Sequence, residues 1–354
     1  MTVYGTLEFS RTAGNLALNC SYIIVYQGGR IVIGTEEEPF ENEAVITLTG
    51  SRIDAELPVY GAKVLAVRGG SIDFHGKPTT SWARLAADVG ADDWEITLDG
   101  DIDWVAGDRI VITSTEFDWL ATDPAVIKSV TGRTVRLTKP LAYDHRGSGW
   151  TSEDGRFSIP KYRAAVGKLT RNVRVQGDDV SVDQQFGAQM VFSTGHTMFQ
   201  NNKLIVRLSN VEVHKAGQGL KLGKYPIHFH LAGNVSDSYI DNCAIHVGFN
   251  RAVAIHGVSN LRVLNNFVYN IRGESPASDR SVPSALTAPP PGHAVFLEDG
   301  TETRNTIAHN LVAVVRPVWS LLAVDQSPAA YWIVNPDNDV IGNVAAGSSH
   351  YGFW

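Results

Sequence analysis

Five asparagines stand in front of short apolar segments in the second half of this sequence, and their spacing constrains the fold more than any other feature. They are separated by 32, 24, 44 and 33 residues and occupy positions Asn210, Asn242, Asn266, Asn310 and Asn343. Self-similarity at such a period, with several short strands per repeat, is typical of a solenoid whose coils bury their apolar faces against one another. An asparagine amide both donates and accepts hydrogen bonds, so it suits a stack of equivalent positions. We therefore predict an all-β protein with a right-handed parallel β-helix over residues 169–354; a β-sandwich with Asn in its turns is the alternative.

Residues 274–292 interrupt this pattern between the third and fourth asparagines. The segment holds five of the 15 prolines, and Pro cannot donate a hydrogen bond to a strand ladder. Without these 19 residues the 44-residue step becomes 25, which is close to the shortest step of 24. We interpret the segment as an insertion in the β-helix, either an external loop or an unspliced intron read as protein.

The first half of the sequence also predicts strands. In residues 1–75 short runs alternate apolar and polar side chains between glycine turns, and residues 94–143 repeat this style. The composition agrees, because 33 glycines and only 19% charged residues are typical of turns and buried strands. From these patterns we predict three parts before the β-helix: a first β domain at 1–88, a small β module at 89–145 and a connecting loop at 146–168.

Charge and hydropathy exclude several classes of partner. The formal net charge is −7, and residues 201–354 carry equal numbers of acidic and basic residues, so the acidic excess belongs to the first 200 residues. A chain without a cationic surface gives no electrostatic support for nucleic-acid binding. No run of 18 apolar residues is present, so we predict no membrane span in this chain, and its start lacks the pattern of a signal peptide. The neutral second half leaves an acidic polysaccharide open as a partner.

Histidine is concentrated in the repeat region, and eight of the eleven histidines follow the first repeat asparagine, Asn210. His214 and His246 each follow a repeat asparagine by four residues, so we expect them at equivalent points on successive coils. Alignment of the residues after His230 with those after His256 also places these two histidines side by side, at the spacing of about 4.8 Å between neighbouring strands.

Strand alternation predicts which way the side chains around His230 point. Between Tyr225 and Leu231 the apolar side chains alternate with His228 and His230. Successive residues of a strand point to opposite faces, so we expect the apolar residues up to Leu231 on the inner face and both histidines on the outer face.

An acidic residue is expected next in this column. Carried to the following coil, the same frame places Asp299 beside His256, or Glu298 if the register slips by one. The candidate catalytic residues are therefore His228, His230, His256, Asp299 and Glu298. Basic residues within a few positions of this strip are candidates to hold an anionic substrate, and they are Lys221, Lys224, Arg251, Arg272 and Arg304.

Three interpretations of the strip stay open. A site that binds and cuts an acidic polysaccharide needs a proton donor and acceptor beside basic anchors, which His and carboxylate groups supply. A metal site needs two or three of these groups to converge, and no HxxxH or CxxC spacing enforces that, so no metal ligand is assigned, although calcium is a possible cofactor. The third interpretation is structural: an outward polar ladder hydrogen-bonded along the stack. For Glu298-Asp299-Gly300 a β-turn is at least an equal alternative to catalysis.

Several longer motifs resemble one family of proteins. Four of them resemble the later part of the eight-glycine (G-eight, or G8) domain: Tyr4-Gly-Thr-Leu-Glu-Phe, Tyr22-Ile-Ile-Val-Tyr-Gln-Gly-Gly-Arg, Ile46-Thr-Leu-Thr-Gly and Ile72-Asp-Phe-His-Gly. Others follow in the family's order: Tyr225-Pro-Ile-His-Phe-His-Leu-Ala-Gly, Val253-Ala-Ile-His-Gly and Gly292-His-Ala-Val-Phe-Leu-Glu-Asp-Gly. The family comprises fibrocystin and fibrocystin-L, the cell-migration-inducing hyaluronan-binding protein and the transmembrane cell-surface hyaluronidase. The resemblance implies a parallel β-helix, an extracellular or cell-surface location and, for two members, hyaluronan depolymerisation.

The sequence also departs from this family. In the hyaluronan-degrading members an additional domain, with residues implicated in activity, follows the Ser-Trp that corresponds to Ser81-Trp82; here Trp104-Val-Ala-Gly-Asp follows after some twenty residues, as in the fibrocystin-like branch. The chain begins part-way through the G-eight domain and stops at Trp354, where family members continue, so we expect a partial G-eight domain in a fragment or truncated gene model.

From the residues and the resemblance together we expect an extracellular protein that binds a hyaluronan-like polysaccharide, with hyaluronidase-like hydrolysis an open question. The alternative is a non-catalytic cell-surface coat or receptor-like protein of the fibrocystin-L type. A polysaccharide lyase is the least favoured class, because the sequence shows no carboxylate cluster for calcium beside a basic residue.

Overall fold

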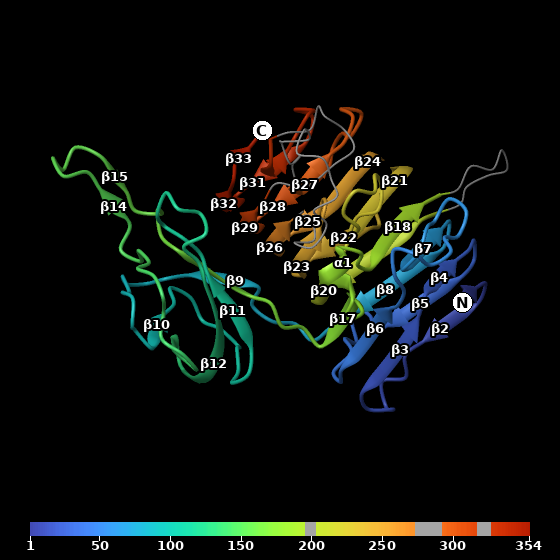
Figure 1. The fold of residues 1–354 in the computed structure, drawn as a ribbon, viewed down its shortest axis with the longest axis horizontal. Coiled ribbons are helices and arrows are strands. Elements are labelled where there is room, and N and C mark those ends of the chain that lie inside the picture. Colours follow the sequence, from blue (N-terminus) through green and yellow to red (C-terminus); the bar gives the residue numbers. More distant parts are fainter. Residues whose placement is uncertain (195–202, 273–291, 317–326) are drawn as a thin grey trace.

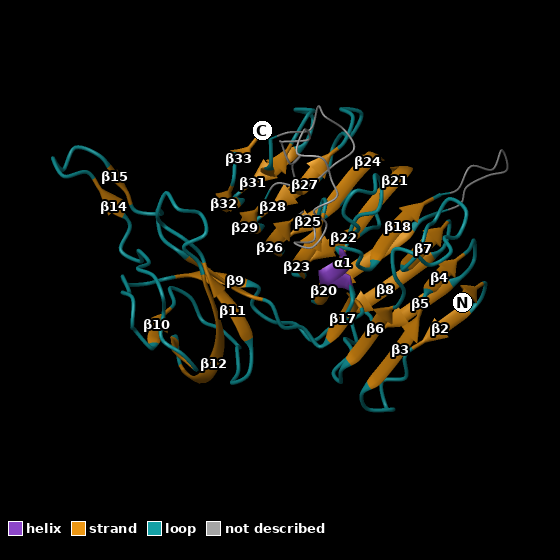
Figure 2. Cartoon of the chain, in the orientation of Figure 1, coloured by secondary structure: helices purple, strands orange, loops and turns teal. Residues whose placement is uncertain are grey.

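Strands make up almost all the regular structure of the protein (Figures 1 and 2). The computed structural model describes residues 1–194, 203–272, 292–316 and 327–354. Three parallel sheets, named A, B and C here, wind into the predicted right-handed β-helix, and the chain visits them in this order on each coil. Within the described residues, no helix has the length and apolar character that crossing a membrane requires.

The strands of each sheet follow one another in chain order. In the described part of the chain, sheet A contains β1 (Thr2–Val3), β4 (Tyr22–Val25), β7 (Val64–Arg68), β18 (Gln189–Ser193), β21 (Ile227–Asn234), β24 (Val253–Ser259), β27 (His293–Leu297), β30 (Ala329–Trp332) and β33 (Tyr351–Phe353). Sheet B contains β2 (Thr6–Glu8), β5 (Arg30–Ile33), β8 (Ser71–His75), β19 (Ile205–Ser209), β22 (Tyr239–Asp241), β25 (Arg262–Leu264), β28 (Thr306–Ala308) and β31 (Asp339–Ile341). Sheet C contains β3 (Leu16–Cys20), β6 (Ala44–Leu48), β17 (Val173–Gly177), β20 (Val211–Ala216), β23 (Ala244–Phe249), β26 (Phe267–Arg272), β29 (Leu311–Val315) and β32 (Val344–Ser348).

The β-helix begins at β1 rather than near residue 169, where the sequence placed its start. β17 pairs in parallel with β6 on one side and with β20 on the other, and β18 joins β7 to β21 in the same way. The G-eight-like segment therefore contributes coils to the same solenoid as the later repeats. The sequence hides this continuity because a long insertion separates β8 from β17 and breaks the repeat.

That insertion is an antiparallel module (Figure 1). Its sheet contains, in spatial order, β10 (Glu95–Thr97), β13 (Thr134–Leu137), β12 (Asp123–Thr131), β11 (Arg109–Ile112), β16 (Ala165–Lys168) and β9 (Trp82–Arg84). A ribbon of β14 (Trp150–Thr151) and β15 (Ser158–Ile159) extends from it. The module sheet thus spans residues 82–168, so the expected boundaries at 89–145 are too narrow, and the expected loop at 146–168 contains β16.

The module packs β11 and β16 against the outer face of sheet C. Val111 and Ala165 share a buried apolar cluster with Phe267, Leu311 and Ala313 of that sheet. The main core lies inside the coils, where inward aliphatic and aromatic side chains of all three sheets are buried. The outer face of sheet C is thereby covered in part by the module.

Asparagine side chains form the predicted ladder. Oδ1 of Asn343 accepts hydrogen bonds from the backbone N and Nδ2 of Asn310 at 3.0 and 2.9 Å, and Asn310 accepts from the same two atoms of Asn266, both at 2.9 Å. Asn266 and Asn310 are buried. Each amide satisfies backbone and side-chain groups of the adjacent coil, which explains why asparagine marks the repeat. A second ladder, of Asn305 and Asn338, was not predicted.

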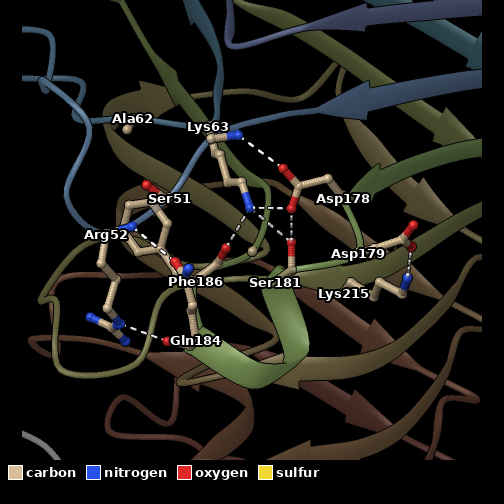
Figure 3. Close-up of polar contacts among 12 residues, drawn as sticks. Ser51, Arg52, Ala62, Lys63, Asp178, Asp179, Ser181, Gln184, Phe186 and Lys215 are labelled. Carbon is tan, nitrogen blue, oxygen red and sulfur yellow. Dashed lines mark hydrogen bonds and ion pairs between the residues drawn. The ribbon is translucent and has the colours of Figure 1, made fainter.

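A buried lysine ties together the coils on the two sides of the module (Figure 3). Lys63, just before β7, is fully buried, and its Nζ donates hydrogen bonds to Asp178 Oδ1 at 2.6 Å and to Ser181 Oγ at 2.9 Å. A third bond goes to the carbonyl of Phe186 at 2.9 Å. These partners flank or belong to the short helix α1 (Ser181–Gln184), which follows the module. Burial lowers the pKa of Lys63 and the bond to Asp178 opposes that shift, so the ammonium depends on this partner.

Candidate functional site

The candidate site lies on the outer face of sheet A, where β21 and β24 lie side by side (Figure 1). Ile227 and Phe229 are fully buried in the core of the coil, so His228 and His230 point to the outer side, as strand alternation predicted. His230 lies opposite His256 in the parallel register, which confirms the predicted pair.

Leu231 departs from the predicted alternation. We expected it on the inner face, but its exposed fraction is 46% and its φ of 50° is left-handed. The pairing of β21 with β24 shifts between His230 and Gly233, and such a bulge turns the intervening side chain around. Gly257, directly after His256, also has a positive φ, of 58°. The strands therefore bend just beyond the two histidines.

Three imidazoles converge at this bend. Nδ1 of His230 lies 3.2 Å from Nδ1 of His256. The centroid of the His228 ring lies 5.0 Å from that of His230 and 6.4 Å from that of His256. Three nitrogen atoms, one from each ring, lie within 4.8 Å of one another. Strand stacking therefore produces the convergence that no short sequence spacing enforces.

His228 is more enclosed than an outer-face position suggests. Its exposed fraction is 4%, because the segment before β21 folds over it: its ring lies 4.9 Å from that of Tyr225, and its Nδ1 donates to the carbonyl of Gly223 at 3.0 Å. Burial lowers the pKa of His228 to about 3, and the neighbouring His230 acts in the same direction. His228 is therefore neutral at physiological pH.

Two carboxylates border His256. β24 and β27 pair with Ile255 opposite Leu297, so Glu298 comes next in the column and Asp299 one residue further. Oε2 of Glu298 lies 3.9 Å from Nδ1 of His256, and Oδ2 of Asp299 lies 3.3 Å from Nε2 of the same ring. The two carboxylates that the sequence offered as alternatives therefore both lie beside His256, Glu298 near Nδ1 and Asp299 near Nε2.

The segment that carries these carboxylates is also a hydrogen-bonded turn. Asp299 Oδ1 accepts from the backbone N and Oγ1 of Thr301 at 3.1 and 2.7 Å, and the hydroxyl's hydrogen bond lowers the pKa of Asp299. The buried carboxylate of Glu302 accepts from the backbone N atoms of Gly257 and Gly300, both at 2.9 Å. The turn interpretation and the site interpretation of this segment are therefore compatible.

Arg251 holds Glu298 in place. Its guanidinium is buried 3.7 Å from the centroid of the Phe296 ring. Its Nη1 lies 3.3 Å from Glu298 Oε1 and 3.0 Å from the hydroxyl of Tyr225. This predicted substrate anchor is thus engaged with the protein itself, and it orients the carboxylate toward the histidines.

The two predicted lysines bind the chain of the earlier coils. Nζ of Lys224 donates to the carbonyls of Val59 and Tyr60 at 2.9 and 2.8 Å, and Lys221 forms an ion pair with Glu56. Burial lowers the pKa of both lysines. Both lysines belong to the segment that covers His228, and their partners lie in the loop before β7, more than 150 residues earlier in the sequence. The lysines therefore attach the covering segment to an earlier coil.

Arg272 and Arg304 do not lie on the strip. Arg272 ends β26 in sheet C, and its side chain lies outside the described residues, as does most of the predicted insertion at 274–292. Arg304 is exposed two residues before β28, in the turn that leads to sheet B. Each arginine is only a few residues from the strip in sequence, but the chain turns from one sheet to another within that distance.

A groove of about 400 Å³ runs along sheet A beside the histidines. His228, His230 and Lys224 line it, together with residues that the sequence did not single out: Tyr60, Arg68, Ser193 and Leu231. Arg68 lies opposite Ser193, and Ser193 follows Phe192, the partner of Phe229, so both belong to the column of His230. Arg68 was missed because β7 was not assigned to the same sheet. The available signal was its place at the end of a short apolar segment, Val64 to Val67.

Fold and site together define a parallel β-helix protein with histidines and carboxylates beside an outer groove. The G8 domain family matches residues 1–86, and the CEMIP β-helix family matches residues 192–275 and 288–354. The chain belongs to the family of G8-domain, parallel β-helix proteins that includes fibrocystin-L. The interruption between the two β-helix matches falls inside the predicted insertion.

Relatives of this chain are considerably longer than it is. Fibrocystin-L from Mus musculus is 37% identical over 99% of this chain and 8% of its own length, and Fibrocystin-L from Homo sapiens is 37% identical over 99% and 9%. Protein rliB from Dictyostelium discoideum is 29% identical over 98% of this chain and 30% of its own length. The chain thus spans less than a third of each of these relatives. Among solved structures, the tailspike protein gp49 from Pseudomonas phage LKA1 is 12% identical with a TM-score of 0.23, covering 97% of this chain and 53% of that chain, a likeness too weak to carry an argument.

Proposed function

We propose that the groove on sheet A binds an extracellular acidic polysaccharide of the hyaluronan type, and that His230 and His256 are the proton-transfer groups if the bound chain is cleaved. The observation that carries the proposal is the in-register stack of His230, His256 and Glu298 at the edge of a groove of about 400 Å³. A linear ligand in this groove would cross several coils. Membership in the family of fibrocystin-L supports a cell-surface or extracellular location.

The groove offers contacts suited to a sugar acid. Arg68 and Lys224 contribute cationic groups, and guanidinium or ammonium groups form charge-assisted hydrogen bonds with carboxylates. Tyr60, Val59 and Leu231 contribute apolar surface on which the less polar faces of sugar rings would lie.

His256 has the arrangement of a general acid or base. The carboxylate of Asp299, 3.3 Å from Nε2, favours a proton on that nitrogen, which leaves Nδ1 as the acceptor on the side of His230. His230 at 3.2 Å is the partner that would take or return the proton. Glycosidic hydrolysis needs such a donor and acceptor pair beside the scissile bond.

The test measures binding and cleavage separately. The purified chain is incubated with hyaluronan of defined length, binding is measured by calorimetry and product size by gel filtration, with His230→Ala and His256→Ala as site variants. His350→Ala, at an exposed histidine far along the chain, is the matched control. We expect the site variants to lose affinity by at least tenfold and to abolish any cleavage while the control behaves as wild type. Unchanged binding and unchanged cleavage in both site variants would refute the proposal.

Binding without cleavage by the wild-type chain would support the alternative function, a non-catalytic cell-surface protein. The observation that favours it is the short path from Ser81 to the module strand β11, which leaves no room for the additional domain of the hyaluronan-degrading relatives described above. Mutation-sensitive depolymerisation would exclude it.

A further inference from the structure

We propose that His228, His230 and His256 bind a divalent transition metal of the zinc class, with Glu298 beside them. The three side chains each offer one nitrogen, and these nitrogens lie within 4.8 Å of one another. The proposal goes beyond the glycan site, with which it shares residues, because it concerns an ion that neither the sequence nor the relatives assign.

The orientation of His228 is the first argument. Its Nδ1 is 3.0 Å from the carbonyl of Gly223, and a carbonyl only accepts, so Nδ1 carries the hydrogen and Nε2 presents its lone pair. Nε2 is buried and makes no hydrogen bond. A histidine ligand of a metal is commonly held in this way, by a backbone carbonyl that binds its other nitrogen.

The spacing of the donor atoms is the second argument. Oε2 of Glu298 lies 4.0 Å from Nε2 of His228 and 3.9 Å from Nδ1 of His256, and it makes no hydrogen bond although it is buried. Nδ1 of His230 lies 3.2 Å from Nδ1 of His256. Zinc bonds of about 2.0–2.1 Å in a tetrahedron place the ligand atoms about 3.4 Å apart. These three separations, of 3.2, 3.9 and 4.0 Å, are therefore close to those of a tetrahedral set, and the two longer ones are too long for hydrogen bonds.

The surroundings of Glu298 are the third argument. Arg251 lies 3.3 Å from Oε1, the other oxygen of the carboxylate, so Oε2 is aimed at the histidines. In metal sites, the side chains that ligate the ion are commonly oriented by hydrogen bonds from neighbouring groups that do not touch the ion. Imidazole nitrogens with one carboxylate suit zinc, copper, nickel or iron, whereas calcium prefers a shell of oxygen ligands. The calcium that the sequence left open is therefore not the ion that this cluster favours.

The test uses metal alone, in the absence of any glycan. The purified chain is stripped with a chelator and titrated with Zn²⁺ in a calorimeter, bound metal is counted by mass spectrometry after gel filtration, and Co²⁺ is added as a spectroscopic probe. We expect one equivalent of Zn²⁺ per chain and visible Co²⁺ bands of tetrahedral intensity. His228→Ala and His256→Ala should each weaken binding by at least a hundredfold, whereas His350→Ala should leave it unchanged.

Because His228 is buried, its variant is compared with wild type in chelator by circular dichroism, and the part-exposed His256 supplies a second variant that does not depend on packing. The proposal is overturned if the wild-type chain retains no metal, or if His256→Ala retains it with wild-type affinity. Glycan binding is measured in chelator, so either proposal can fail while the other stands.

Discussion

The β-helix carries two pairs of histidines stacked in register on neighbouring coils, one on sheet A and one on sheet C. On sheet A the pair is His230 and His256; on sheet C it is His214 and His246, at the equivalent points that the sequence predicted. The rings of the sheet C pair stack at 4.4 Å between centroids. The two pairs thus share their backbone setting and differ in what surrounds them.

The sheet C pair lies beside a buried ionic network. Glu212 is fully buried, and its Oε1 accepts from Nε2 of His246 at 2.9 Å and from Arg109 of the module, while its Oε2 accepts from the backbone N of Arg171 at 3.1 Å. Arg174 lies 3.4 Å from the same oxygen. Burial alone would raise the pKa of Glu212, but the hydrogen bond from His246 and the nearby arginines hold it well below its usual range.

The comparison teaches that the same backbone stacking can place a histidine pair beside a buried carboxylate network or beside an open groove. On sheet C the inserted module supplies a cation and covers part of the outer face, so we interpret this pair as structural. On sheet A the pair faces a groove, and the nearby Nε2 of His228 and Oε2 of Glu298 make no hydrogen bond. The same ladder is thus a packing device in one place and a candidate site in the other.

Removing a carboxylate from the sheet C cluster should have the largest effect, a loss of stability that the same change on sheet A does not cause. Glu212→Ala should lower the free energy of unfolding by about 3–5 kcal/mol, because removing one partner of a buried ionic network leaves the other charges uncompensated. The measurement is urea denaturation, with Asp299→Ala as the control; its carboxylate is part-exposed and should matter by less than about 1 kcal/mol. Equal losses in the two variants would contradict the distinction between the sheets.

The pH dependence of stability should also reveal the covered pair. Burial lowers the pKa of His214 to about 3; the neighbouring His246, Arg109 and Lys215 act in the same direction, and Glu212 opposes them. A histidine of the unfolded chain titrates near about 6.5, so below that pH the unfolded state binds more protons than the folded state. The contribution of His214 is therefore fully present above about pH 6.5 and is lost as the pH falls toward 3, at about 1.4 kcal/mol per pH unit.

The variant that tests this is His214→Gln, which should remove that slope from a series of urea denaturations between pH 6.5 and 4. His350→Gln, at an exposed position, should keep it. If both variants retain the wild-type slope, His214 is not a partly buried group that stays neutral in the folded chain.

Ligand affinity should depend on the sheet A groove and not on the sheet C cluster, the reverse of the expectation for stability. Arg68→Ala, in the groove on sheet A, should weaken the binding of hyaluronan by about tenfold because one charge-assisted contact is lost. Arg174→Ala, at the sheet C cluster, should leave the affinity unchanged although it lowers stability. Calorimetry at two salt concentrations measures both, and a larger loss of affinity in Arg174→Ala would reverse the assignment.

The smallest expected effect concerns the bend after each histidine. His246 is followed by Val247 with a φ of 51°, and His230 by Leu231 with a φ of 50°. A left-handed conformation costs a residue with a Cβ about 1 kcal/mol relative to glycine. Val247→Gly should therefore raise the unfolding free energy by up to about 1 kcal/mol, measured by denaturation, with Val268→Gly in the core as the destabilising control. A clear loss of stability in Val247→Gly would show that its side-chain packing outweighs the backbone strain.

Local regularities made much of this fold predictable from the sequence. The asparagine steps predicted the β-helix because buried amide ladders require the same residue on successive coils, as at Asn310 and Asn343. Alternation placed His228 and His230 outside, and the repeat placed His256 beside His230.

Features that depend on distant segments were not predictable. The inserted module separates the first coils from the later coils in the sequence, although both belong to the same sheets. The sequence therefore did not connect Arg68 with the histidines. The burial of His228 depends on a covering segment that Lys224 anchors to an earlier coil. Leu231 points outward because the strand has a bulge there, and the alternation of apolar and polar residues does not predict a bulge.

The position of the module has a consequence for how the chain folds. To complete the third coil, 97 residues must be spanned between β8 and β17, against ten between β5 and β6. As a flexible loop, the longer span would raise the entropic barrier to closing that coil by about 2 kcal/mol. The first and last strands of the module, β9 and β16, pair with each other, so once the module has folded, its two ends are already neighbours. We therefore expect the module to fold before the coils on either side of it join.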